Sequence, residues 1–260
     1  MSKKIIIGNW KMNPASLKEA GKLFSDIGKL ISDVKKTAVV ICLPFLYLPY
    51  FAKVTKSEGK LKKITLGAQN LFWENNGAYT GEISGEMLYD AGARYVIVGH
   101  SERRSLGENN SDINKKVKAA LSSGLIPILC IGESIRDENH AYFNLVKVEL
   151  EECLNGISKN STAKIIIAYE PIWAISSTPN RKDATSDDCR EMIIFIRKIL
   201  SDKFGKESAS IKIIYGGSVN ERDAEDFLKN GGIDGLLSGR ASLVPKKFSK
   251  IVKICEALNK

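Results

Sequence analysis

IIIAYEPIW, residues 165–173, joins a run of apolar residues directly to a carboxylate, with no turn between them. The run does not alternate apolar with polar residues, which is typical of a strand covered on both faces in a parallel sheet. Pro171 lacks an amide donor and favours extended backbone at the residue before it, so the strand ends here and Glu170 lies at the sheet edge. Glu170 is therefore a candidate general base. A solvated glutamate that merely closes a strand fits this segment equally well.

Short apolar runs of this kind recur along the chain, and segments with the apolar spacing of helices separate them. The runs lie at residues 5–7, 38–42, 64–68, 95–98, 126–131, 165–168, 211–215 and 235–237. Such a series predicts an α/β fold in which a single domain, residues 1–260, forms a closed (β/α)8 barrel. Functional residues are expected on the loops that follow the strands, where active sites of these barrels lie.

The composition narrows the class of protein. Lys and Arg number 39 against 30 Asp and Glu, which leaves a net charge of +9. The lysines are scattered in doublets without a basic stripe interleaved with aromatics, so we expect neither a nucleic-acid partner nor a membrane partner. The N-terminal region offers only a three-residue apolar run at 5–7, which predicts a cytoplasmic chain. The five cysteines show no CxxC spacing, which favours reduced thiols over disulfides or a metal site.

Candidate functional residues follow the first and fourth predicted strands. Asn9 and Lys11 place an amide and an ammonium after the first strand, where Lys11 either anchors an anion or is simply solvated. His100 is one of two histidines and follows the fourth strand. Ser101 can cap a short helix whose dipole disfavours the protonated ring, leaving a neutral imidazole that donates a hydrogen bond. A core histidine bonded within its own loop is the alternative.

Glycine-bearing loops follow the seventh and eighth predicted strands. Gly216 and Gly217 precede Ser218 after the seventh, and Gly239 follows the eighth. Glycines let backbone amides approach a ligand, and loops at these two strands of a (β/α)8 barrel commonly bind phosphate. The pair of loops therefore indicates a phosphate site.

Motifs spread from the first predicted strand to the last occur together in one known family. They are Asn9-Trp10-Lys11, Gly67-Ala68-Gln69-Asn70, GAYTGEIS at 77–84, GHSERR at 99–104, CIGE at 130–133, YEPIWA at 169–174 and YGGSVN at 215–220. In this order they resemble the triosephosphate isomerase family. The resemblance implies a TIM barrel that interconverts dihydroxyacetone phosphate and glyceraldehyde 3-phosphate without a metal or an organic cofactor. It also implies a homodimer in which the loop carrying Thr80 inserts beside the partner's active site.

The resemblance assigns roles to the residues at the strand ends. Glu170 would move a proton between neighbouring carbons, and neutral His100 would polarise the carbonyl and stabilise the enediolate oxygen. Asn9 and Lys11 would supply positive potential.

Further roles concern the groups around these four. Ser101 would hold Glu170 while the site is open, and Glu102 would position Lys11. The phosphate would be bound by amides around Ser218 and Gly239 and by the lid residue Ser176.

Two departures from the family pattern concern the lid and the last strand. The lid would move between hinges at residues 171–173 and 182–184, yet its tip, residues 176–181, reads SSTPNR where the family usually has Gly-Thr-Gly. After the last strand, Arg240 replaces a glycine. Arg240 either adds a cation at the phosphate or swings into solvent.

Two other functions compete with this interpretation. Another phosphosugar-processing barrel would share the phosphate loops, and a silent barrel kept as a scaffold would have lost a catalytic residue. The presence of Glu170, His100 and Lys11 argues against both.

Overall fold

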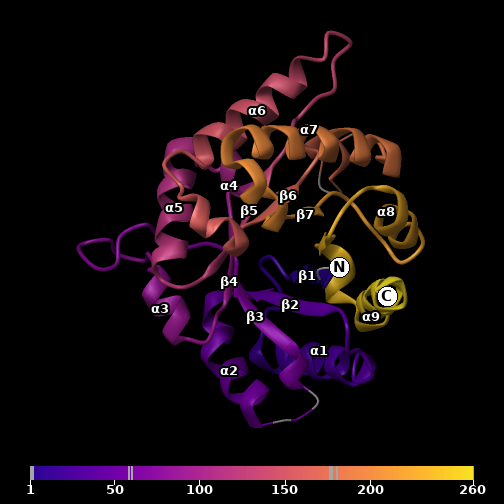
Figure 1. Ribbon diagram of the computed structural model, residues 1–260. Coiled ribbons are helices and arrows are strands. Elements are labelled where there is room, and N and C mark those ends of the chain that lie inside the picture. The colour runs from indigo at the N-terminus through magenta and orange to yellow at the C-terminus, as the bar shows by residue number, and fades with distance from the viewer. Residues whose placement is uncertain (1–2, 58, 60, 176–177, 180, 260) are drawn as a thin grey trace.

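Parallel strands close into a barrel in the computed structural model, which describes residues 3–57, 59, 61–175, 178–179 and 181–259. The order is β1 to β8, and β1 pairs with β8 (Figure 1). The strands are β1 (Ile5–Asn9), β2 (Ala38–Leu43), β3 (Ile64–Ala68), β4 (Tyr95–Val98), β5 (Ile126–Ile131), β6 (Ile166–Tyr169), β7 (Lys212–Tyr215) and β8 (Gly235–Ser238). The predicted (β/α)8 barrel is confirmed.

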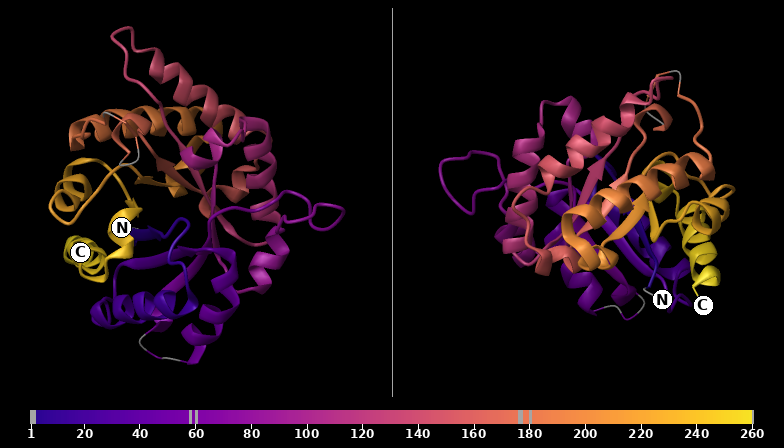
Figure 2. Two further views of the ribbon diagram at one scale, coloured as in Figure 1. Left: turned by 180° about the vertical axis from the view of Figure 1, so that it is seen from behind. Right: turned by 45° about the horizontal axis from the view of Figure 1, so that its top comes forward.

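Helices form a layer outside the barrel, and the two chain ends lie close together (Figures 1 and 2). The α-helices are α1 (Leu17–Leu30), α2 (Leu48–Ser57), α3 (Gly85–Asp90), α4 (Ser101–Ser105), α5 (Asn110–Ser122), α6 (Ala141–Cys153), α7 (Ser186–Phe204), α8 (Ala224–Asn230) and α9 (Pro245–Leu258). The 3-10 helices are η1 (Phe45–Tyr47), η2 (Leu61–Lys63), η3 (Lys159–Lys164), η4 (Ile172–Ala174), η5 (Gly205–Ser210) and η6 (Arg240–Leu243). Within the described ranges, none of these helices has the length and apolar character needed to cross a membrane.

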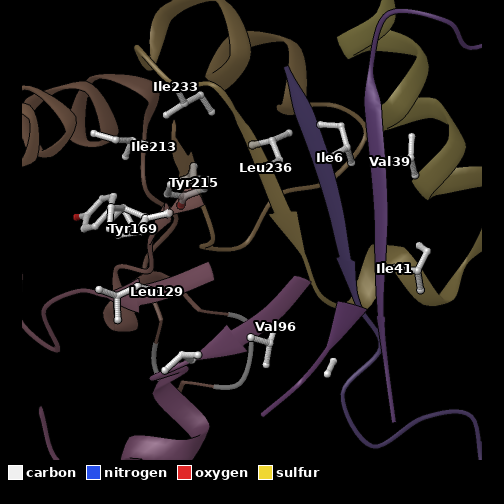
Figure 3. Packing of buried hydrophobic residues seen from close by; sticks show 14 of the residues in the cluster. Ile6, Val39, Ile41, Val96, Leu129, Tyr169, Ile213, Tyr215, Ile233 and Leu236 are labelled. Atoms are coloured by element: carbon white, nitrogen blue, oxygen red, sulfur yellow. The ribbon is translucent and has the colours of Figure 1, made fainter. Parts of the chain in front are cut away.

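Two apolar layers hold the barrel together, because successive side chains of a strand point to opposite faces. Ile6 and Val39 belong to the larger layer (Figure 3), which also includes helix residues such as Phe24. Ile7 and Val40 belong to a smaller cluster that fills the barrel interior. Each such buried side chain contributes about 1.5–3 kcal/mol relative to an exposed one.

The strand boundaries place the predicted base immediately after β6. The expected run began at Ile165, but that residue caps η3, and its N–H donates to the carbonyl of Thr162 at 3.1 Å. The strand starts one residue later and continues through Tyr169. Glu170 is thus the first residue beyond the strand. We call the barrel end where the strands finish the carboxyl rim, and the end where they start the amino rim.

Candidate active site

The carboxyl rim opens onto a cavity of about 710 Å³. The predicted residues that line it are Asn9, Lys11, His100, Glu170, Ser218, Gly239 and Arg240. They come from the end of β1 and from the loops after β1, β4, β6, β7 and β8, which a closed parallel barrel brings to one end. Ser176, the predicted lid contact, lies outside the described residues.

Glu170 is buried beside the imidazole of His100 rather than solvated. Its side chain is 2% exposed, and its Oε1 lies 3.4 Å from His100 Nε2. Its Oε2 accepts a hydrogen bond from the backbone N–H of Ser101 at 3.3 Å. Ser101 therefore contacts the carboxylate as expected, through its amide. The N–H of Glu170 donates to the carbonyl of Ile131 at 2.8 Å, which fixes the backbone from which the side chain projects.

The hydrogen bonds of His100 define which ring nitrogen carries a proton. His100 is the N-cap of α4, and its Nδ1 accepts a hydrogen bond from the N–H of Glu102 at 3.2 Å. An accepting nitrogen carries no proton, so the neutral ring bears its proton on Nε2. This Nε2–H points toward Glu170. The imidazole is thus bonded within its own loop and also offers a donor to the cavity.

Lys11 is held in a backbone conformation that non-glycine residues seldom adopt. Its φ is 53°, in the left-handed region. Its N–H donates to Asn9 Oδ1 at 3.0 Å, and its carbonyl accepts from Gln69 Nε2 at 2.9 Å. Its Nζ pairs with Glu102 Oε1 at 2.5 Å, as expected. Such strain costs about 1–3 kcal/mol and persists where neighbouring bonds enforce it.

The loops after β7 and β8 approach the reacting groups through residues without side chains. A Cβ on Gly216 would lie 2.8 Å from Glu170 Cγ, and one on Gly239 would lie 3.4 Å from Lys11 Cε. The hydroxyl of Ser218 is buried and finds no hydrogen-bond partner within the described part of the chain. This side of the cavity therefore offers mainly backbone to a ligand. Arg240 is exposed at the cavity mouth.

The sequence analysis gave no role to a buried cluster formed by residues of the CIGE and YEPIWA motifs and their neighbours. Glu133 is fully buried, and its Oε1 accepts hydrogen bonds from Tyr169 Oη and Trp173 Nε1, each at 2.8 Å. Arg136 Nε lies 3.2 Å from the same oxygen, and its Nη1 lies 2.9 Å from Asp188 Oδ1. Burial and then the Glu133 carboxylate raise the pKa of Tyr169 well above its ordinary value. Tyr169 thus stays a donor, and the cluster holds Trp173, where the first hinge of the lid is expected, against Glu133.

Thr80 lies away from the cavity. It is exposed on the segment between β3 and α3, which projects from the barrel in Figures 1 and 2. The base of this loop is closed by the N–H of Phe72, which donates to the carbonyl of Ile83 at 2.8 Å. A residue so placed cannot reach the cavity of its own barrel.

Comparisons with known proteins agree with this geometry. The model of the triosephosphate isomerase family matches residues 4–255. A triosephosphate isomerase of Caldanaerobacter subterraneus is 45% identical over 97% of this chain and 99% of its own length. One of Thermoanaerobacter pseudethanolicus is 44% identical with the same two coverages. The crystal structure of triosephosphate isomerase from Bartonella henselae has a TM-score of 0.85 and 35% identity, covering 97% of this chain and 98% of that one. The chain therefore belongs to the triosephosphate isomerase family.

Proposed function

We propose that this chain is a triosephosphate isomerase that interconverts dihydroxyacetone phosphate and D-glyceraldehyde 3-phosphate through an enediolate. The observation that carries the proposal is the contact between the buried side chain of Glu170 and the imidazole of His100 in a single cavity, where Glu170 Oε1 and His100 Nε2 lie 3.4 Å apart. A carboxylate can accept a proton from carbon, and a neutral N–H can stabilise the oxygen that becomes negative. Family membership supports the same reaction.

The two groups divide the reaction between them. Glu170 removes a proton from the carbon next to the carbonyl, and the electron pair of that C–H bond forms the enediolate while charge moves to the carbonyl oxygen. The Nε2–H of His100 bonds to this oxygen. Glu170 then returns a proton to the neighbouring carbon as the hydroxyl proton passes between the two oxygens. Asn9 and Lys11 add positive potential in a site shielded from bulk water.

The phosphate is assigned to the loops after β7 and β8. The amides around Ser218 and Gly239, with the Ser218 hydroxyl, offer donors without crowding the ligand. Arg240 adds a cation at the mouth of the cavity. Ser176 closes over the phosphate with the lid, which excludes water from the enediolate.

A coupled assay on the purified chain tests this function. Each triose phosphate is supplied separately, and appearance of the other is followed, with four- to six-carbon sugar phosphates as controls. We expect conversion in both directions and no turnover of the longer sugars. Turnover of a longer sugar phosphate instead would support a different phosphosugar barrel, and absence of any turnover would contradict the proposal.

A homodimer is the second part of the proposal. Large apolar side chains are exposed near the carboxyl rim in the segments after β1, β2 and β3, which are neighbouring strands. They include Met12 at 95%, Leu46 at 74%, Met87 at 56% and Tyr79 at 45% exposure. Exposed apolar side chains on neighbouring segments support an interface there. Thr80 follows Tyr79 on the exposed segment between β3 and α3.

Replacing Thr80 by arginine tests that surface. A long charged side chain placed in an apolar interface loses its hydration without gaining a partner. Thr80→Arg should therefore shift the sedimentation coefficient from dimer to monomer and lower the activity per chain. Unchanged sedimentation as a dimer with full activity would remove Thr80 from the interface.

We also retain two expectations from the sequence, a cytoplasmic location and a single domain over residues 1–260. Cell fractionation with an antibody to the chain tests the first. Limited proteolysis tests the second, because a single domain resists cutting between its β/α units while two domains release a folded half.

A further inference from the structure

Arg104 contacts the backbone beside His100 and the backbone of the neighbouring strand β5, and it does not line the main cavity. It belongs to α4, four residues after His100, and its side chain is 16% exposed. Its Nε donates to the carbonyl of Gly99 at 2.9 Å, and its Nη2 donates to the carbonyl of Cys130 at 3.3 Å. Gly99 is the residue before His100, and Cys130 lies near the end of β5. One planar guanidinium therefore joins the ends of two neighbouring strands.

The same guanidinium reaches the peptide beside Glu170 through Glu149. Arg104 Nη1 lies 3.5 Å from Glu149 Oε1, and Glu149 Oε2 accepts the N–H of Gly132 at 3.0 Å. A Cβ on Gly132 would lie 2.0 Å from the carbonyl oxygen of Glu170, so these two peptides are packed in direct contact. The chain of contacts runs from the backbone of His100 to the backbone of Glu170.

Arg104 and Glu149 are largely buried, so the loss of a bond between them would be costly. Glu149 is 13% exposed, and burial raises the pKa of its carboxyl while Arg104 opposes the rise. The remaining Nη1 bond of Arg104, to Asn110 Oδ1 at 2.6 Å, anchors the guanidinium to α5. A buried charge that loses its partner is strongly destabilised, so the group is held in one geometry.

We propose that Arg104, acting with Glu149, is a positioning residue that sets the separation of His100 and Glu170. The expected effect on kcat rests on the proposed function, whereas the effect on the position of His100 can be measured in a protein that does not turn over substrate. Arg104 does not line the cavity proposed to hold the substrate. It acts by fixing the two peptides from which the imidazole and the carboxylate project, and a displacement of about 1 Å at such groups can cost on the order of 10²-fold in rate.

The matched control is Arg197 on the amino rim. Arg197 Nη1 donates to the carbonyl of Ile211 at 2.9 Å, and its Nη2 pairs with Asp234 Oδ2 at 2.7 Å. It thus makes the same two kinds of bond as Arg104, to a carbonyl and to a carboxylate, far from the cavity. Arg197→Gln therefore measures how the loss of such bonds affects the fold, without an effect on the cavity.

The experiment compares Arg104→Gln with Arg197→Gln by NMR of the histidine-labelled protein and by kinetics. The chain holds two histidines, so His140→Gln assigns their resonances. We expect Arg104→Gln to shift the His100 resonances, to lower kcat about tenfold and to change KM less than about twofold. Arg197→Gln should leave the resonances and kcat unchanged. In a double-mutant cycle, Glu149→Gln and Arg104→Gln should be non-additive in kcat.

Several results would overturn the proposal. One is a folded Arg104→Gln protein whose His100 resonances do not move, and another is an equal fall of kcat in both arginine variants. Should Arg104→Gln not fold, Arg104→Lys replaces it, because a single ammonium holds one of the two strand-end carbonyls and should give an intermediate shift. An inactive wild-type protein would refute the proposed function, while the His100 resonances would still decide whether Arg104 positions this ring.

Discussion

The amino rim and the carboxyl rim are built from the same strands but use their polar side chains differently. At the amino rim, Glu256 accepts hydrogen bonds from the N–H groups of Lys36 and Thr37, and Asp234 accepts the N–H of Ile213. The hydrogen bonds of these carboxylates hold the backbone at the amino rim. At the carboxyl rim, Glu170 and its neighbours face a cavity instead. The contrast shows that polar groups at the carboxyl rim remain available to a ligand, whereas those at the amino rim are satisfied by hydrogen bonds that stabilise the fold.

The largest effect is expected from Glu170→Gln, which removes the proton acceptor and keeps the shape. General-base catalysis contributes about 10²- to 10⁴-fold, so kcat should fall by that order. The free energy of unfolding should not decrease, because the variant no longer buries a carboxylate that is 2% exposed. Assay and urea unfolding of the same preparation check both. Turnover near the wild-type rate would remove Glu170 from the role of base.

A somewhat smaller loss is expected from His100→Gln at the same rim. The amide can still donate, but its nitrogen lies elsewhere and is less acidic than the imidazole. Stabilisation of the enediolate should weaken by roughly 2–4 kcal/mol, seen as a lower kcat with a similar KM. If KM rises while kcat holds, His100 binds substrate without stabilising the transition state.

The variant Gly216→Ala tests whether the loop after β7 sets the position of Glu170. The added Cβ would lie 2.8 Å from Glu170 Cγ, so the carboxylate must shift. We expect kcat to fall about tenfold while the protein stays folded. Gly21→Ala is the control, because a Cβ on this glycine of α1 would meet nothing within 4 Å. Equal rates for the two variants would show that the base tolerates displacement.

The smallest effect is expected at the amino rim, and on stability alone. Backbone N–H groups of residues 35–37 outweigh the opposing effect of burial and lower the pKa of Glu256 from 4.5 to about 2. A lowered pKa means that the carboxylate stabilises the fold above about pH 4.5 and loses this contribution as the pH falls through about 2.

The substitution Glu256→Gln should therefore cost about 1 kcal/mol near pH 7, a value discounted for solvent screening, and should leave kcat unchanged. Urea unfolding of both proteins across this pH range measures the difference. A difference that persists below pH 2, or a changed kcat, would contradict the separation of the two rims.

Much of the carboxyl rim could be predicted because its signals are local. An unbroken apolar run followed by Glu170 and Pro171 indicates a strand end, and family motifs name the residues there. The conformation of Lys11 could not be predicted, since a distant side chain, Gln69, enforces its positive φ. The start of β6 was misplaced by one residue because an apolar run does not reveal that Ile165 closes η3.

The hydrogen-bond networks beneath the carboxyl rim could not be predicted from the spacing of residues in the sequence. Glu133 and Trp173 are 40 residues apart, and Arg104 and Cys130 are 26 apart. Their side chains are ordinary for their segments, and only closure of the barrel brings them into contact. Long-range hydrogen bonds of this kind depend on the register of neighbouring strands, which single-sequence patterns leave open.

The central claim is that the carboxyl rim isomerises triose phosphates by moving a proton through Glu170. Conversion of glyceraldehyde 3-phosphate in D2O, followed by NMR of the product, tests it most directly. A proton that resides on a carboxylate can exchange with solvent before it returns, so the wild-type product should carry deuterium on the carbon that receives the proton. The variant Glu170→Gln should incorporate none on the same timescale. Product formed rapidly with no deuterium at that carbon would show that the transferred hydrogen never exchanges with solvent, as in a direct hydride shift, and would contradict the account.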